Sequence, residues 1–421
     1  MAQMTPDTSR MVGGLSGDPI PLLIPIVMTT ILLIRNPINF NHTKLWTFVT
    51  IMLCWSVAIC YKIHDFSSSN LSYYLFLFYA IFIAFIHIRV YGRDLFPIYE
   101  HIMVVFSIIS LCLWGMNVLV PSTGELFHMF PETSYGNNVL YLFNWMDPAK
   151  EQVYYSISRN AGCSWEPGRF AIMLVPAILI NLSREGVVFW GNKKIIILLL
   201  ALASTMSTTG YSIVLLIYVL YGLNGFNVKN IFAFIFIALP ITIFVFSLDF
   251  MGEKIQDKIN YEGLTRERMN SVNYNAKEHG DEYVASFDRF ESAYFEWINF
   301  QNEPLLGYGR NTDNSWFRQK ISKNFSLTGG IVKIFSQHGI FIGLFLYLIL
   351  FYSSFKISQT CWYQKKSAFA IMLLLSSISY QIFCIPIFTA FWLYGLFGYE
   401  EDEINEEDME YLETEDIYEV E

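Results

Sequence analysis

The segment 158–170, which reads SRNAGCSWEPGRF, holds the residue types that could act on an anionic substrate. Glu166 lies directly before Pro167, and Arg159 and Arg169 flank this carboxylate. Proline suits the first position of a helix, and a carboxylate just before it faces the positive end of the helix dipole, so Glu166 can be explained as a helix cap. Arginine, however, binds phosphate bidentately and stays charged at any working pH. The segment therefore predicts either a capped helix start or a phosphate site with a carboxylate that accepts a proton.

A second set of cations lies in a long polar stretch further along the chain. The set consists of Arg266, Arg268, Arg289 and Arg310. Arg310 ends the motif PLLGYGR, in which Gly-x-Gly marks a tight turn as readily as a phosphate cradle. Solvation at a surface explains any single arginine, whereas several together could neutralise a leaving diphosphate without a metal.

His338 stands alone inside an apolar run, about 12 Å past Gly330 if the run is helical. Such a residue is either a hydrogen-bonded core histidine or, because imidazole ordinarily titrates near neutrality, a base that deprotonates a hydroxyl. Glu166 could perform the same role, and residue types alone do not choose between them.

A run of hydroxyl residues, Ser204 to Thr209, joins two short apolar runs and is followed by Gly210. Its side chains, including Thr208 and Thr209, either satisfy backbone groups freed by a helix break or contact a ligand. Large aromatic side chains near these candidates could serve as stacking platforms. They are Trp165, Tyr294, Trp297, Tyr308 and Trp316.

The elements that position these residues are those of a membrane protein. The chain of 421 residues is 54% hydrophobic and only 15% charged, whereas a soluble domain carries about 25% charged residues. We find eleven apolar runs, several of them shorter than the roughly 20 residues of a full span. They cover about Ile20–Ile34, Leu45–Tyr61, Leu71–Ile88, Ile102–Val120, Phe170–Leu182, Ile195–Met206, Tyr211–Tyr221, Ile231–Phe250, Ile331–Phe351, Ala368–Ile385 and Ile387–Phe397. The sequence therefore predicts an all-α polytopic membrane protein with about eleven transmembrane segments, some of them short or broken.

The loop cations predict the topology, because Lys and Arg in short loops collect on the cytoplasmic side. If 195–221 forms two helices, eleven such cations lie inside and only Lys62 lies outside; one continuous helix would give seven inside and five outside. We therefore expect two helices here, an N-terminus outside and a C-terminus inside. This topology places two large loops, 121–166 and 251–330, on the extracytoplasmic side.

The chain divides into a multi-pass membrane domain, 1–399, and an acidic tail, 400–421. The tail holds thirteen carboxylates and no Lys or Arg, so a net charge of −10 becomes +3 for the first 399 residues. Such a segment is typical of solvated, disordered chain. Six cysteines lack CxxC spacing, and no His/Cys cluster suits a metal. We expect no metal, no cofactor and no nucleic-acid partner.

A helix with an aromatic stripe is expected in the second large loop. The stripe consists of Phe287, Phe290, Tyr294 and Trp297, at spacings of three and four. Charged residues occupy the opposite faces, namely Asp288, Arg289, Glu291 and Glu296. This pattern predicts either a helix lying on the membrane face or one that simply roofs the bundle.

Several of these motifs, taken in order, resemble the bacterial O-antigen and capsular polysaccharide polymerases of the Wzy type. The resemblance is carried by Arg159…WEPG leading into a helix, the STTG junction, Arg289…PLLGYG and a helix beginning near Gly330. It runs from about Arg159 to Phe351 and extends to the whole chain only as helix count and loop placement. The paired Arg-x10-Gly pattern of these polymerases is absent, since positions 170 and 300 are both Phe. Which arginines hold the diphosphate is therefore left open.

The resemblance implies a metal-independent glycosyltransferase with a GT-C-like helical bundle in the bacterial inner membrane. Such enzymes join undecaprenyl-diphosphate-linked oligosaccharides at the outer face of that membrane, among membrane lipids and beside a chain-length regulator. On this interpretation Arg289 and Arg159 bind the diphosphate, Glu166 or His338 activates the acceptor hydroxyl, and Arg169 and Arg310 support them. The related O-antigen ligases use the same donor with another acceptor, and a flippase for lipid-linked sugars is the non-enzymatic alternative. Many transporters are built from repeats, which this sequence lacks.

Overall fold

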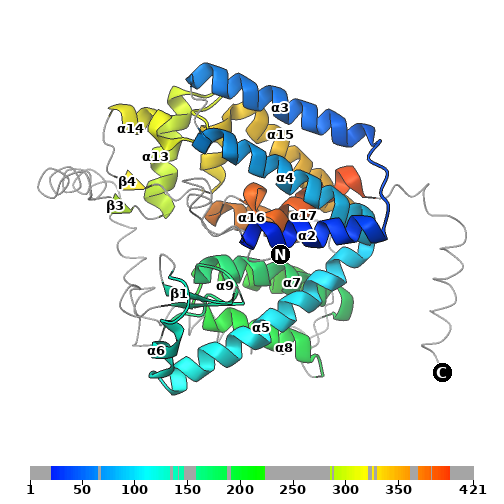
Figure 1. Cartoon of the computed structure of the whole chain (residues 1–421), viewed down its shortest axis with the longest axis vertical. Coiled ribbons are helices and arrows are strands. Elements are labelled where there is room, and N and C mark those ends of the chain that lie inside the picture. Colours follow the sequence, from blue (N-terminus) through cyan, green and yellow to red (C-terminus); the bar gives the residue numbers. More distant parts are fainter. Residues whose placement is uncertain are drawn as a thin grey trace, which may run out of the picture.

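The computed structural model describes residues 20–64, 68–132, 136–140, 142–146, 158–186, 191–222, 285–286, 289–320, 325–326, 330–360, 368–380 and 382–398, and this part of the chain is predominantly helical (Figure 1). Its longer helices are α2 (Ile20–Arg35), α3 (Thr43–Ile63), α4 (Ser68–Tyr91), α5 (Leu95–Leu119), α7 (Pro167–Glu185), α8 (Lys193–Ser204), α9 (Thr208–Gly222), α13 (Arg289–Asn302), α15 (Ile331–Thr360), α16 (Ala368–Ser379) and α17 (Pro386–Phe397). Ten of the eleven predicted apolar runs coincide with helices, and the run 231–250 lies outside the described residues.

Three stretches of the described chain are helical, long enough and apolar enough to cross a membrane. They are Thr43–Ile63, Tyr73–Leu119 and Ile331–Gln359. The second holds α4 and α5, which are separated by a single 3-10 turn, η1 (Gly92–Asp94). Shorter apolar helices include Thr208–Tyr221, Ala368–Ile378 and Ile387–Phe397. The protein is therefore a helical membrane protein.

The expected division of the run 195–221 into two helices is confirmed. The helix α8 ends at Ser204 and α9 begins at Thr208. Between them Met206 adopts a left-handed backbone, with φ of 49°. Both short helices pack against α7. We call residues 205–207 the α8–α9 break.

A second break divides α15, and the apolar run gave no indication of it. Gly339 has φ of 77° and ψ of 173°, which no helix contains. This conformation is open only to glycine, and a side chain here would also lie about 2.0 Å from the carbonyl oxygen of Leu305. The residues on either side of Gly339 therefore form two helical pieces, which we treat as meeting at the α15 break.

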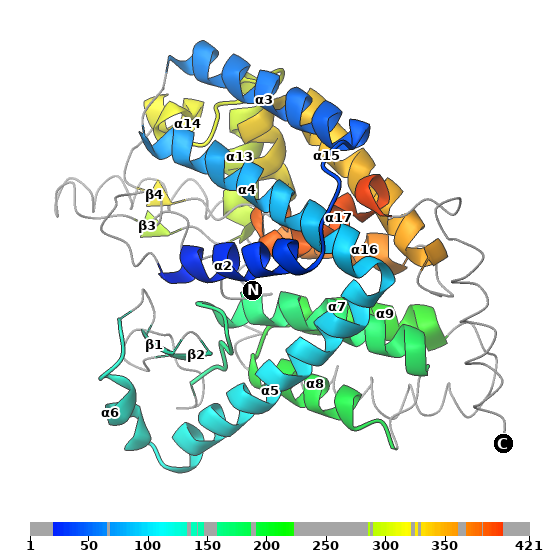
Figure 2. The same cartoon turned by 45° about the vertical axis from the view of Figure 1, so that its right-hand side comes forward.

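The short elements gather at one end of the helical bundle in both views (Figures 1 and 2). They are α6 (Thr123–Phe127), the antiparallel hairpin of β1 (Gly136–Val139) and β2 (Phe143–Met146), η3 (Thr312–Asn314), α14 (Trp316–Lys320) and the parallel pair β3 (Ala285–Ser286) and β4 (Phe325–Ser326), together with α13. We call this the loop end. In the core, α17 packs between α4 and α15, and η4 (Ile382–Cys384) leads into it.

Candidate functional site

The predicted site residues lie mainly in two loop segments at the loop end. The first, 158–166, precedes α7, and we call it the entry loop. The second, 303–310, follows α13, and we call it the docking loop. Each of them closes one of the two helix breaks.

The entry loop satisfies the backbone carbonyls that are freed where α8 ends. The backbone N–H of Asn160 donates to the Ser204 carbonyl at 3.0 Å, and its side-chain amide donates to the Ser204 hydroxyl at 2.8 Å. Arg159 donates from Nε to the Thr205 carbonyl at 3.1 Å and from Nη2 to the Met206 carbonyl at 3.4 Å. Since irregular backbone within a membrane bundle must find such partners, Arg159 both closes the break and is fixed beside it.

Glu166 occupies the helix N-cap position of α7, with an extended backbone and Pro167 at the first helical position. Its carbonyl accepts the N–H groups of Arg169 and Phe170, but its side chain makes no capping hydrogen bond. The carboxylate instead accepts a hydrogen bond of 2.8 Å from the hydroxyl of Tyr380, at the end of α16. Glu166 therefore holds the predicted cap position, but its side chain is directed to another helix.

The remaining candidates of the first set surround this helix start. Arg169 lies buried in the first turn of α7, near Cys163. Burial raises the pKa of the Cys163 thiol to about 12, although the Arg169 charge opposes this rise. Thr208 and Thr209 form the first turn of α9, which packs on the start of α7.

Trp165 in the entry loop is tied to the hairpin. Its carbonyl accepts a hydrogen bond of 3.4 Å from the side-chain amide of Asn144 in β2. Its ring is half-buried. The hairpin therefore fixes the backbone of the entry loop.

The docking loop closes the α15 break through its backbone. The N–H groups of Tyr308 and Gly309 donate to the carbonyls of Ser336 and Gln337, both at 3.0 Å. In the opposite direction, the N–H of Ile340 donates to the Pro304 carbonyl at 2.8 Å. The groups freed by the break are thus paired, as buried irregular backbone requires.

Glycines permit this close approach of loop and helix. Gly307 and Gly309 have φ of 67° and 79°. A side chain on Gly307 would lie 2.4 Å from the backbone of Gln337. The Gly-x-Gly motif, which the sequence left open between turn and phosphate cradle, here shapes a turn that docks on a broken helix.

His338 lies at the α15 break, fully enclosed by aromatic side chains. The Tyr73 hydroxyl lies 3.3 Å from its Nε2, and Trp55 donates from Nε1 to its carbonyl at 3.3 Å. The rings of Trp55 and His338 also meet edge to face, with centroids 4.6 Å apart. Arg310 from the docking loop lies over the Tyr73 ring, with Cζ 5.2 Å from the centroid. The structure thus brings His338 and Arg310 to the same tyrosine.

Glu296 holds the docking loop from the other side. This buried carboxylate accepts hydrogen bonds from the hydroxyls of Tyr308 at 3.0 Å and Ser336 at 2.6 Å, and from the Asn299 amide at 3.2 Å. Burial, and then the adjacent Glu296 charge, hold the pKa of the Tyr308 hydroxyl well above its usual range. Tyr308 is itself buried, so in this structure its ring is a docking element rather than an open stacking surface.

The helix α13 buries its two glutamates. Glu291 and Glu296 face the bundle, whereas Tyr294 and Trp297 of the aromatic stripe are about half exposed, at 50% and 48%. The two described residues of the aromatic stripe therefore face outward, and the acidic face packs against α15. Arg289 begins this helix, and its side chain lies outside the described part of the chain.

The predicted residues thus form two sets, one at each helix break. Arg159, Trp165, Glu166, Arg169, Thr208 and Thr209 belong to the first, and Tyr308, Arg310 and His338 belong to the second. The end of α16 connects the sets, because Tyr380 bonds to Glu166 while Ile378 packs against Gly330 at the start of α15.

Sequence reasoning missed several residues that position these sets. Tyr380 stands in a short polar interruption within the predicted apolar run Ala368–Ile385, which is a signal that could have found it. Tyr73 begins an otherwise ordinary apolar run and carries no such signal. Asn160 lies within the segment 158–170, but its capture of the α8 end depends on a contact 44 residues away in the chain.

Comparisons of this chain with protein-family models, with curated proteins and with solved structures found no match in any of the three.

Proposed function

We propose that this protein is a polysaccharide repeat-unit polymerase of the bacterial inner membrane. It would transfer a glycan from an undecaprenyl-diphosphate-linked donor to a lipid-linked repeat-unit acceptor at the outer face of that membrane. The proposed topology has about eleven spans, the loops 121–166 and 251–330 outside, the N-terminus outside and the acidic tail inside. A chain-length regulator and the surrounding lipids are the proposed partners.

One observation carries most of this proposal. Each helix break at the loop end is closed by a loop that carries an arginine, and each set also holds a group able to accept a proton. Arg159 and Glu166 both belong to the entry loop, and Arg310 and His338 both contact Tyr73. In the proposed reaction the acceptor oxygen bonds to the anomeric carbon, the bond from that carbon to the diphosphate breaks, and the hydroxyl proton passes to Glu166 or His338. Arginines neutralise the departing diphosphate, with Arg289 as a further candidate.

The test uses a strain that depends on this protein for its surface polysaccharide. Arg310→Ala is expected to lower polymer synthesis by about 100-fold at equal protein level in the membrane, because charge stabilisation of the leaving group is lost. Single repeat units should then accumulate on the lipid carrier. Arg159→Ala and Arg289→Ala are expected to behave in the same way.

Arg318→Ala is the matched control, since Arg318 lies beyond the same loop and pairs with Asp313 at 2.6 Å. It should leave the polymer unchanged. Normal polymer in the Arg310→Ala strain would contradict the role of Arg310. Accumulation of fully polymerised lipid-linked chains would indicate a ligase instead, and intermediates held on the cytoplasmic leaflet would indicate a flippase.

A further inference from the structure

One polar atom at the α15 break, Nδ1 of His338, has no hydrogen-bonding partner in the described part of the chain. The imidazole of His338 is only 3% exposed, and its Nε2 meets the Tyr73 hydroxyl. Its Nδ1 is inaccessible and has no hydrogen-bonding partner among the described residues. Buried polar atoms are nearly always paired, so this atom requires an explanation.

The imidazole ring has two neutral forms, with the proton on Nδ1 or on Nε2, and the missing partner of Nδ1 is more costly in the first than in the second. If the proton sits on Nδ1, the structure buries an N–H donor with no acceptor, which is rare in proteins. If the proton sits on Nε2, that N–H donates to the Tyr73 oxygen and Nδ1 presents only a lone pair. The second form satisfies the donor and leaves an atom able to accept a hydrogen bond.

We propose that Tyr73 is a positioning residue that holds His338 in the Nε2–H form, so that Nδ1 is the atom that takes the proton of the acceptor hydroxyl once the acceptor has displaced the side chains that cover it. This inference rests on the proposed function. When the acceptor oxygen bonds to the anomeric carbon, its proton would pass to Nδ1, and the resulting imidazolium would keep its Nε2–H on Tyr73. The Arg310 cation over the Tyr73 ring fixes the tyrosine by a cation–π contact. The docking loop thereby determines which nitrogen is available.

The protein contains internal references for both ring forms. Nδ1 of His42 accepts the N–H of Leu45 at 3.3 Å, so His42 carries its proton on Nε2. Nδ1 of His87 lies 2.8 Å from the Ile83 carbonyl, which can only accept, so His87 carries its proton on Nδ1. We expect His338 to resemble His42 and to differ from His87.

Solid-state NMR of the full-length protein in lipid bilayers, labelled with 15N-histidine and held at about pH 8, reads the protonated nitrogen directly. The His338 signals are those that disappear in His338→Gln. We expect the wild-type Nδ1 of His338 to be unprotonated, like that of His42. A proton on Nδ1 in the wild type would overturn the inference, and this measurement requires no substitution of Tyr73.

Two phenylalanine variants isolate the hydroxyl. Tyr73→Phe keeps the ring beneath Arg310 but removes the acceptor of Nε2–H. Neither neutral form is then favoured by a hydrogen bond, so a population of His338 with the proton on Nδ1, as in His87, should appear. Tyr74→Phe is the control, because its ring contacts Trp55 and Tyr73 while the bond to Nε2 comes from Tyr73. An unchanged ring form in Tyr73→Phe, or an equal shift in Tyr74→Phe, would contradict the positioning role.

Kinetics separate this inference from the proposed function. Tyr73→Phe should lower kcat about 100-fold with KM unchanged, since the acceptor still binds but no correctly placed base is present. If the protonated nitrogen of His338 changes while turnover of lipid-linked repeat units stays normal, Tyr73 does position the ring but His338 is not the base. If neither changes, Tyr73 has no such role.

Discussion

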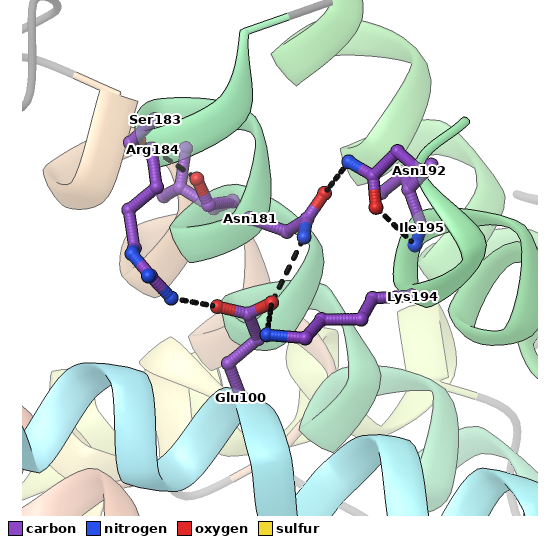
Figure 3. Close-up of polar contacts among 8 residues, drawn as sticks. Glu100, Asn181, Ser183, Arg184, Asn192, Lys194 and Ile195 are labelled. Carbon is purple, nitrogen blue, oxygen red and sulfur yellow. Dashed lines mark hydrogen bonds and ion pairs between the residues drawn. The ribbon is translucent and has the colours of Figure 1, made fainter. Parts of the chain in front are cut away.

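At the scale of single residues, Glu100 is the clearest case of a charge placed inside the bundle. Its side chain is only 1% exposed, yet it accepts hydrogen bonds from Asn181 at 2.8 Å and Arg184 at 2.9 Å, and Lys194 lies 3.6 Å away (Figure 3). The two cations are 37% and 44% exposed. Because Glu100 lies in the second turn of α5 and α6 follows the last turn, this network is far from the loop end. It ties α5, α7 and α8 together.

Because Glu100 is buried and its cationic partners are largely exposed, substitutions of the two kinds of residue should differ in how much stability they cost. Arg184→Ala leaves a buried carboxylate with a weaker set of partners and should cost about 2 kcal/mol. Glu100→Gln removes the charge, and the exposed cations can turn to water, so it should cost less. The double variant Glu100→Gln/Arg184→Ala should be more stable than Arg184→Ala alone, because it has no buried charge that lacks its partner.

Unfolding in detergent by heat or denaturant would measure these differences. Glu185→Gln is the control, since Glu185 follows Arg184 directly but is exposed. It should have almost no effect. If the double variant were the least stable of the set, the burial of the Glu100 charge would not be the source of the cost.

At the scale of elements, apolar runs sufficed to predict most helices, because burial in a bilayer leaves an uninterrupted apolar stretch few other options. The α8–α9 break was predictable as well, since a Ser/Thr run and the loop charges both indicated it. The α15 break was not. A lone Gly339 in an apolar run is tolerated in many helices. Here the break depends on the docking loop, which pairs with both sides of it through residues 28 to 36 positions away in the chain.

The α15 break predicts a sharp difference between two glycines. Gly339→Ala should destabilise the protein by about 3 kcal/mol or more, because its backbone conformation is strained for alanine and the new methyl group would meet the Leu305 carbonyl. Gly115→Ala in α5 should be neutral or stabilising by up to about 1 kcal/mol, because nothing lies within 4 Å and alanine favours the helix.

Thermal unfolding of both variants checks this, together with protease cleavage in the docking loop. Released from α15, that loop should be cleaved faster in Gly339→Ala than in the wild type or Gly115→Ala. Equal stability and equal cleavage of the two variants would mean that α15 can run straight through position 339.

At the scale of the whole molecule, the sequence predicted which loops hold the candidates but not how they are arranged. It placed Arg159 and Glu166 on one loop and Arg310 on the other, yet it gave no sign that each loop closes a helix break. These pairings join residues 28 to 47 positions apart, and nothing in local residue spacing encodes them. The burial of Glu296 could not be predicted for the same reason. Its partners Tyr308 and Ser336 become neighbours only when the docking loop folds back onto α15.

The arrangement at the loop end predicts which positions share a side of the membrane. Leu126 in α6 and Leu305 in the docking loop are each 59% exposed and lie at the loop end, whereas Glu185 lies beside the Glu100 network at the other end of α7. In a variant without the six native cysteines, single cysteines at 126 and 305 should react with a membrane-impermeant maleimide in cells whose outer barrier is opened. A cysteine at 185 should react only after the inner membrane is permeabilised, because Arg184, Lys193 and Lys194 mark a cytoplasmic loop. If only one of the cysteines at 126 and 305 reacted, the two positions would lie on opposite sides of the membrane, which would contradict the shared loop end. If the cysteines at 126 and 305 were both shielded while the cysteine at 185 reacted, the two positions would still share one side of the membrane, but the orientation inferred from the loop cations would be inverted. The candidate site would then face the cytoplasm, which would contradict the proposed polymerase.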